Sequence, residues 1–179
     1  LKEKIIAAGG DPERETLTVI PTNEGHSFYK HSDGSCFRCY EFIKDSLAIE
    51  TVEDPTDLYE AAKSFALFQK RLADFPADTL AETIVDFHNT PKRFEALEEA
   101  IKNDVKGRAA SVKEEIEFAL SQKDWISTVT DGLADGSIPL RVTHNDTKIN
   151  NVLFDAATRK GLCVIDLDTV MPGSMLYDF

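Results

Sequence analysis

Two short apolar segments near the end of the chain, residues 151–154 and 162–165, flank a polar turn. Apolar runs of this length on either side of turn-forming residues predict a β-hairpin. Asp146 and Asn151 precede or open the first strand, and Asp166 closes the second. Because the start of one hairpin strand lies beside the end of its partner, we expect these three side chains to converge. Two carboxylates and a carboxamide at one point form an oxygen-rich site that suits Mg²⁺ and phosphates.

The hydrophobic pattern near the amino end predicts three antiparallel strands. Residues 16–20 alternate threonine with apolar residues, and residues 26–30 and 35–43 bracket Asp33-Gly34. An Asp-Gly pair between two such runs favours a hairpin. The first ten residues form a short amphipathic segment that ends in two glycines, which is typical of a helix stop.

Helical spacing dominates the middle of the chain. Asp54-Pro55 predicts the start of a helix that reaches about Asp74, and Thr90-Pro91 predicts another that ends near Gly107. Residues 79–89 are either a helix or a loop. The residues expected on the buried faces of the two helices are Leu58, Ala61, Ala62, Phe65, Phe68, Leu72, Phe94, Leu97, Ile101 and Val105.

A third helical stretch follows. Ser111 and Glu114 have the spacing of a capping box, which predicts a helix through Leu120. Residues 124–133 continue or restart it, and Trp125 is expected in the core.

Composition narrows the class of protein. The chain has 179 residues, of which 42% are hydrophobic and 29% charged, as is typical of one globular domain. A net charge of −12 argues against nucleic acid as a partner, because a polyanion needs a basic face. No stretch has the apolar length of a membrane helix, and no signal peptide opens the chain. Three cysteines without framework spacing favour a reducing compartment, so we expect a cytoplasmic protein with no membrane partner.

The spacing of the polar residues at the hairpin is also that of the protein-kinase catalytic loop. That loop reads H-R-D-x-x-x-x-N and is followed, after a hairpin, by the Asp of D-F-G. In this chain His144, Asp146 and Asn151 stand in that register, and Asp166 follows the second strand.

The chain resembles still more closely the small-molecule kinases of the aminoglycoside phosphotransferase and choline kinase family. Those enzymes read like H-x-D-x-x-x-x-N-V-L followed by I-D, as do residues 144–153 and 165–166 here. Within the family, the sequence around both motifs most resembles the N-acetylhexosamine 1-kinase branch. The resemblance is sharp over roughly residues 140–179 and fainter over 16–139.

This resemblance implies an α+β, protein-kinase-like fold. Residues 1–45 would be the last antiparallel strands of the N-terminal lobe with the hinge. Residues 46–179 would be the helical C-terminal lobe with the catalytic hairpin, truncated at its C-terminal end. The chain begins without Met, stops inside a family motif and has no glycine-rich loop, strand Lys or helix Glu of the kinase type. We therefore expect a fragment of a longer protein that turns over little ATP by itself; the alternative is a complete small domain.

The resemblance also implies roles at the hairpin. Asp146 would take the proton of the acceptor hydroxyl, and Asn151 and Asp166 would hold Mg²⁺. If the resemblance is set aside, Asp146 reads as a loop residue that caps a backbone N–H, and Asn151 and Asp166 as a hydrogen-bonded pair that braces the hairpin. Asp168 lies two residues beyond Asp166, so strand alternation would place both on one face. Asp168 would then bind a second metal ion or support a ligand of the first. Lys148 would offset charge on the transferred phosphate, unless it is a solvated loop residue.

The resemblance also implies residues that bind the nucleotide and residues that support the catalytic loop. The backbone of Glu41 and Ile43 would form the hinge that pairs with adenine. Leu153 and Ile165 would line the adenine site, although a place in the core would explain them equally well. By the same resemblance His144 is a buried structural residue, and a later acidic residue, Asp178, hydrogen-bonds the catalytic loop.

The resulting hypothesis is a Mg²⁺-dependent transfer of the γ-phosphoryl group of ATP to a hydroxyl of a small molecule. The resemblance favours a sugar such as an N-acetylhexosamine, and an aminoglycoside, choline or homoserine acceptor remains open. A non-catalytic, pseudokinase-like binding module is the alternative from another class. Retention of Asp146, Asn151 and Asp166 argues against it for the full-length protein. The sequence does not give the oligomeric state.

Overall fold

The computed structural model describes all residues, 1–179, and they form two compact units. Unit 1 comprises residues 1–75 and 146–169, and unit 2 comprises residues 76–145 and 170–179. Helices and short strands occur in both units, in agreement with the predicted α+β class. The predicted lobes, residues 1–45 and 46–179, divide the chain differently from these two units, and the lobe boundary stays a prediction.

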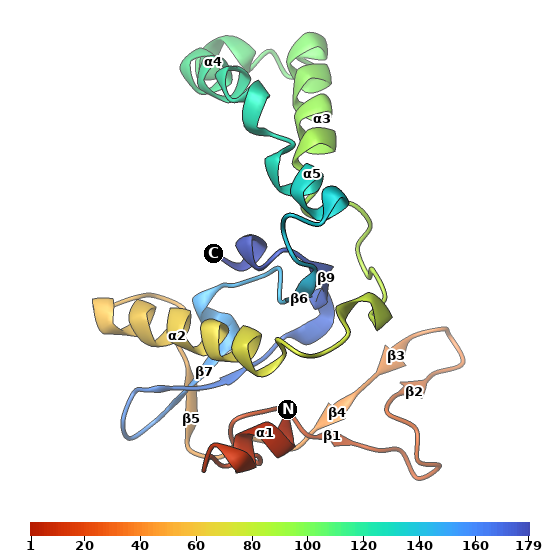
Figure 1. Ribbon diagram of the computed structural model, residues 1–179, viewed down its shortest axis with the longest axis vertical. Helices are drawn as coiled ribbons and strands as arrows, with labels where there is room; N and C mark the ends of the chain where they lie inside the picture. Colours follow the sequence, from red (N-terminus) through yellow and green to blue (C-terminus); the bar gives the residue numbers. More distant parts are fainter. The chain divides into compact units, whose positions relative to one another are not determined.

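Unit 1 combines short strands with one long helix and the hairpin (Figure 1). Its elements are α1 (Lys2–Ala7), β1 (Val19–Ile20), β2 (Tyr29–Lys30), β3 (Cys36–Phe37), β4 (Cys39–Tyr40), β5 (Ser46–Ala48), α2 (Pro55–Arg71), η4 (Ile149–Asn151), β7 (Val152–Asp155), β8 (Gly161–Val164) and η5 (Leu167–Thr169). The predicted hairpin is present as β7 and β8, which pair antiparallel. The predicted first helix is α1, and the chain leaves it through Gly9 at φ 76°.

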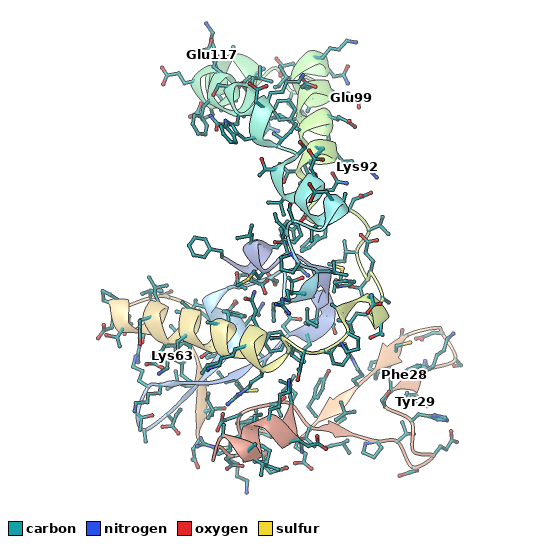
Figure 2. The ribbon with its side chains drawn as sticks, viewed as in Figure 1. Phe28, Tyr29, Lys63, Lys92, Glu99 and Glu117 are labelled. Carbon is teal, nitrogen blue, oxygen red and sulfur yellow. The ribbon has the colours of Figure 1, made fainter.

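The amino-terminal strands are antiparallel, as predicted, but short. β1 pairs with β4 and β2 pairs with β3, and each ladder is two residues long. The predicted turn closes through a bond from the His31 N–H to the Ser35 carbonyl (2.8 Å), with Gly34 at φ 93°. Most side chains of these strands are exposed on both faces, including Tyr29, which Figure 2 labels beside Phe28. Because neither face of these ladders is buried, side-chain packing does little to lengthen the strand pairing beyond the turn.

The core of unit 1 lies between α2 and a three-stranded sheet in the order β5-β7-β8. β5 was not predicted; it joins the sheet antiparallel, with Leu47 opposite Phe154. A Cβ atom at Gly161 would lie 2.7 Å from the Glu60 carbonyl oxygen, so α2 can pack this closely on β8 only because residue 161 has no side chain. The buried residues that meet between helix and sheet are Ile49, Ala61, Phe65, Val152 and Phe154.

Helix α2 begins where the sequence predicted, because the Asp54 side chain accepts a bond from the Thr56 N–H (2.8 Å). Its buried face differs from the prediction. Leu58 is 53% exposed, whereas Asp57 is 1% exposed. Arg159, in the β7–β8 turn, binds both carboxylate oxygens of Asp57 (2.7 and 2.9 Å). This bidentate pair makes it possible to bury a charge that the apolar pattern had assigned to solvent.

Unit 2 is mostly helical, with one small sheet. Its elements are η1 (Ala77–Thr79), α3 (Thr90–Asn103), η2 (Ala109–Val112), α4 (Lys113–Ser121), η3 (Lys123–Trp125), α5 (Thr128–Asp135), β6 (Arg141–Thr143), β9 (Met171–Gly173) and η6 (Met175–Asp178). Strands β6 and β9 pair antiparallel and were not predicted. No helix of either unit combines the length and the apolar character needed to cross a membrane.

Three expectations for unit 2 were wrong. Helix α3 ends at Asn103 because Asp104 adopts φ 34°, so Val105 lies beyond it and is 83% exposed. Ser111 lies in η2 and donates its hydroxyl to the Arg108 carbonyl, so it does not cap α4. Trp125 is 71% exposed. Figure 2 shows Glu99 and Glu117 pointing away from α3 and α4.

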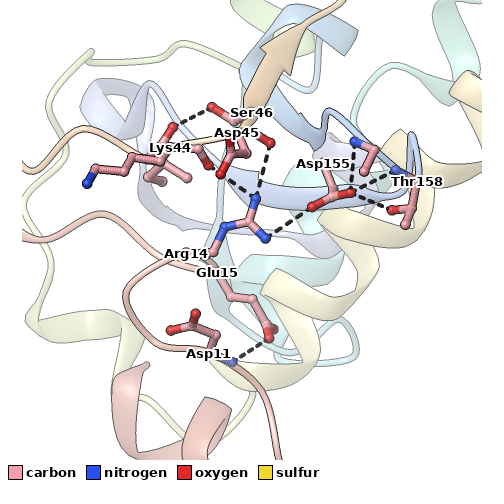
Figure 3. A network of polar contacts seen from close by, with 10 residues as sticks. Asp11, Arg14, Glu15, Lys44, Asp45, Ser46, Asp155 and Thr158 are labelled. Atoms are coloured by element: carbon pink, nitrogen blue, oxygen red, sulfur yellow. Dashed lines mark hydrogen bonds and ion pairs between the residues drawn. The ribbon is translucent and has the colours of Figure 1, made fainter.

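A polar network fixes the chain just after the predicted hinge (Figure 3). Arg14 donates to Asp155 Oδ2 (3.0 Å) and to the carbonyls of Lys44 (3.2 Å) and Asp45 (3.1 Å). The other oxygen of Asp155 accepts from both the N–H and the hydroxyl of Thr158, each at 2.8 Å. The Thr158 bonds first, and then Arg14, lower the pKa of Asp155 from 3.8 to about 2.

This network predicts a pH dependence of stability. Because folding lowers the pKa of Asp155, the carboxylate stabilises the fold above pH 4, and that contribution is lost as the pH falls from about 4 to about 2. Wild-type protein should therefore be more stable than Asp155→Asn at pH 6, with the difference shrinking toward pH 2. Denaturant melts at several pH values measure it. Glu99→Gln, on the exposed face of α3, is the matched control, and a pH-independent difference for Asp155→Asn would contradict the prediction.

Candidate active site

The candidate catalytic and metal-binding residues Asp146, Asn151 and Asp166 belong to unit 1, at or near the open end of the β7–β8 hairpin, away from its turn. The Ile165 N–H donates to the Asn151 carbonyl (2.9 Å), which extends the pairing of the two strands by one residue. The structure therefore brings Asn151 next to the segment that carries Asp166. This follows from the antiparallel geometry, which places the start of one strand beside the end of the other.

The turn from Asp146 to Asn151 is held by its own hydrogen bonds. The Lys148 N–H donates to the Asp146 carbonyl (2.9 Å), and the Asn151 N–H donates to the Lys148 carbonyl (2.9 Å). The Asn151 side chain donates from Nδ2 to the Asp146 carbonyl (2.8 Å) and to Asp146 Oδ2 (3.0 Å). Asn151 is only 5% exposed, so its amide is a fixed support for the Asp146 carboxylate. Because Nδ2 is used here, the oxygen of the same amide is the group that remains for a cation.

Lys148 is paired with Asp146 in this structure. Its Nζ lies 2.9 Å from Asp146 Oδ2, and its side chain is more exposed than that of its partner. The hydrogen bond to Asp146 and the negative charge of that carboxylate raise the pKa of Lys148, with a smaller contribution from Asp166. The ammonium group is therefore charged at neutral pH, and two candidate carboxylates act on it.

Asp166 has an unusual backbone conformation. It follows directly after the paired residues, is exposed, and has a φ of 58°. A residue with a Cβ atom rarely adopts this left-handed conformation, although Asp tolerates it better than most. Such backbone outliers are concentrated at functional sites, where they aim a side chain in a direction that a regular strand would not give.

The reason given for grouping Asp168 with Asp166 was wrong. Strand β8 ends at Val164, and Leu167–Thr169 forms the 3₁₀ helix η5. Strand alternation therefore does not extend to Asp168. Its carboxylate forms an ion pair with Arg38, from the short segment between β3 and β4.

Leu153 and Ile165, predicted for the adenine site, lie on one face of the hairpin. Leu153 is half-buried between Val152 and Phe154, whose buried side chains face α2, so strand alternation points it to the other face. Ile165 pairs with residue 151 and so shares that face with Leu153. The face opposite α2 is thus the one with side chains available for a ligand.

The predicted hinge has an exposed and a buried part. Ile43 is buried, whereas Glu41 and Phe42 are exposed. The Glu41 N–H donates to the Thr18 carbonyl (2.9 Å), and the Ile43 carbonyl accepts from the Ser46 hydroxyl (2.7 Å). Adenine would therefore have to pair with the other two groups, the Glu41 carbonyl and the Ile43 N–H.

In unit 2, Asp178 binds the residues that precede Asp146 in the chain. Its two carboxylate oxygens accept from the N–H groups of His144 (2.8 Å) and Asn145 (2.7 Å). This is the contact that the sequence resemblance implied for Asp178. His144 is fully buried, as expected for a structural residue.

Sequence reasoning missed one contact to the same segment. His88 Nε2 lies 3.2 Å from the Asn145 carbonyl oxygen. The only signal in the sequence is an aromatic pair, Phe87-His88, directly before the helix start at Asn89. Nothing in that pattern indicates a contact with a residue more than fifty positions later.

The oxygen donors of the hairpin fit a hard divalent cation. An Asn amide oxygen and one or two carboxylates are ligands that Mg²⁺ accepts, with water completing its shell. The structure contains no group of three or more His, Cys, Asp and Glu side chains that could hold a metal ion. The arrangement therefore provides a supported carboxylate, a nearby ammonium group and hard oxygen ligands, the groups that phosphoryl transfer requires.

The chain also matches a known protein family. The model of the family described as "Phosphotransferase enzyme family" (APH) matches residues 15–179. The matched range includes all the candidate residues named above.

Proposed function

The chain belongs to the phosphotransferase enzyme family, and we propose that the protein transfers the γ-phosphoryl group of ATP to a hydroxyl group of a small molecule. The observation that carries the proposal is the support of the Asp146 carboxylate by Asn151 at the open end of the β7–β8 hairpin. A loop residue that only capped a backbone N–H would not need a buried amide directed at its carboxylate.

We assign Asp146 as the residue that accepts the proton of the acceptor hydroxyl. Phosphoryl transfer makes the hydroxyl strongly acidic only late in the reaction, so a carboxylate is a sufficient base. Asn151 and Lys148 both contact Oδ2 and so hold the carboxylate in one orientation. In this proposal Lys148 has a second task, to offset charge on the transferred phosphate, for which it would turn from Asp146 toward the nucleotide.

We assign Mg²⁺ to Asn151 and Asp166. When bound, the ion would neutralise part of the charge of the ATP phosphates. The Asn151 amide would serve both partners, since its nitrogen binds Asp146 and its oxygen would bind the ion. Asp168 is a candidate second ligand, and that role would require its carboxylate to exchange Arg38 for the ion.

The nucleotide would bind to the face of the hairpin opposite α2. Leu153 and Ile165 would contact the adenine ring, and the Glu41 carbonyl and Ile43 N–H would pair with its edge. This arrangement uses the backbone groups that the chain itself does not engage in its hydrogen bonds.

For the acceptor we propose a sugar such as an N-acetylhexosamine, with an aminoglycoside, choline or homoserine as the alternatives. A small molecule rather than a nucleic acid or a membrane fits a chain of net charge −12. The test is a screen of these acceptors with ATP and Mg²⁺, in which the full-length protein should form ADP only when the right acceptor is present. Absence of acceptor-dependent ADP across the whole set would contradict the proposal.

The metal assignment makes its own prediction. Asp166→Ala should raise the Mg²⁺ concentration needed for half-maximal activity about 10-fold or more, because a charged ligand is lost. A Mg²⁺ titration of the initial rate at saturating ATP measures it. Asp168→Ala, run in parallel, determines whether that carboxylate contributes. Asp124→Ala, at an exposed position of η3, is the matched control, and an Asp166→Ala titration equal to it would remove Asp166 from the metal site.

A further inference from the structure

Both backbone polar groups of Asn145, its N–H and its carbonyl, contact side chains of unit 2. The Asn145 N–H donates to Asp178 Oδ1 (2.7 Å), and its carbonyl oxygen lies 3.2 Å from His88 Nε2. Asn145 is 7% exposed and has a φ of 69°, a left-handed conformation that residues with a Cβ atom seldom adopt. The Asn145 side chain also donates to the Thr143 carbonyl (3.2 Å), so this local bond and the contacts with Asp178 and His88 together favour the conformation. The carbonyl group concerned is the one bonded to the nitrogen of Asp146.

The chemistry of the contact defines the state of His88. A carbonyl oxygen can only accept, so Nε2 must carry the hydrogen. That condition is met by one neutral tautomer and by the protonated ring, but not by the other neutral tautomer.

The ring of His88 is also fixed by its neighbours. It stacks on Tyr177 with ring centres 4.8 Å apart and an interplanar angle of 22°, and Phe87 meets it edge-on at 4.8 Å. Tyr177 directly precedes Asp178 in the chain, so one short segment supplies both the stacking partner of His88 and the carboxylate that binds the Asn145 amide.

The turn that carries His88 is held by further bonds. The Asn89 side chain accepts from the Lys92 N–H (3.1 Å) at the start of α3 and donates to Asp86 Oδ1 (2.9 Å). Lys92 forms an ion pair with the other oxygen of Asp86 (2.5 Å). His88 is thus presented from a braced turn and not from a loose loop.

We propose that His88 is a positioning residue of the phosphotransferase reaction, which fixes the Asn145–Asp146 peptide group and thereby the backbone of the proton-accepting residue. The inference rests on the proposed role of Asp146. A catalytic group has to be held within about 0.5 Å of its productive place, and a peptide plane that can rotate next to it does not meet that condition.

Kinetics of two substitutions test the proposal in the full-length protein. His88→Phe keeps the ring on Tyr177 but loses the donor, and should lower kcat about 10-fold with KM for ATP unchanged, as expected for loss of one hydrogen bond. His88→Gln places an amide donor near the position of Nε2 and should recover most of kcat. His31→Phe, at an exposed histidine of the β2–β3 turn, is the matched control. Wild-type kcat in a folded His88→Phe variant would overturn the proposal.

A measurement that needs no activity separates this inference from the proposed function. In a ¹⁵N-labelled sample, NMR should find a hydrogen on Nε2 of His88 that exchanges slowly with solvent, and the signal should be missing in His88→Phe. An unprotonated Nε2 would overturn the positioning role whatever the activity. If Asp146→Asn lowers kcat but His88→Phe does not, only the inference about His88 fails. If neither substitution changes kcat, the proposed role of Asp146 fails first.

Discussion

Asp146→Asn should lower kcat by about 10²- to 10⁴-fold, the range that a positioned general base contributes. The replacement keeps the shape of the side chain and an oxygen that can still accept the bond from Asn151 Nδ2. It removes the ability to take a proton from the acceptor hydroxyl. Because the change touches neither Glu41 nor Ile43, KM for ATP should stay close to the wild-type value. Initial rates at saturating acceptor and varied ATP measure both constants.

Lys148→Met is the informative companion to that variant. It removes the ion pair at Asp146 Oδ2 but leaves the bond from Asn151, so the carboxylate keeps one of its two supports. We expect a smaller fall in kcat than for Asp146→Asn. An Asp146→Asn enzyme with wild-type kcat would remove Asp146 from its role. A Lys148→Met enzyme as impaired as Asp146→Asn would mean that the charge of Lys148 at the transferred phosphate matters as much as the proton-accepting carboxylate.

The sequence predicted those parts of the fold that depend on interactions between residues close together in the chain, namely turns, helix caps and hairpins. The β7–β8 hairpin follows from apolar runs and a polar turn, and α2 and α3 begin where Asp54 and Asn89 can cap them next to a proline. The convergence of Asn151 with the segment of Asp166 follows from hairpin geometry alone.

The parts that the sequence did not predict depend on distant partners. Strands β5, β6 and β9 are three residues long, too short for an alternating pattern, and each exists because of a partner about thirty or a hundred positions away. Asp57 is buried because Arg159 reaches it from another element. His88 contacts Asn145 for the same kind of reason. Asp166 leaves the strand conformation, which made alternation a false guide to Asp168.

Phe154→Ala should lower the free energy of unfolding by about 3–5 kcal/mol, the usual cost of removing a fully buried Phe side chain. Phe154 has no exposed surface and packs with Ile49, Phe65 and Val152 between α2 and the sheet. Phe154 lies on β7, which begins directly after Asn151, so the cavity would loosen the strand that orients the proposed site. Urea unfolding followed by far-UV circular dichroism measures the loss.

The matched control is Phe118→Ala, the same change at a side chain that is 69% exposed on α4. Substitutions at such surface positions usually change stability by no more than about 0.5 kcal/mol. The site should respond in parallel: at a temperature where Phe154→Ala is still folded, its kcat should fall while that of Phe118→Ala does not. Equal urea midpoints for the two variants would mean that the packing of α2 on β7 and β8 is not what holds the hairpin, and hence Asn151 and Asp166, in place.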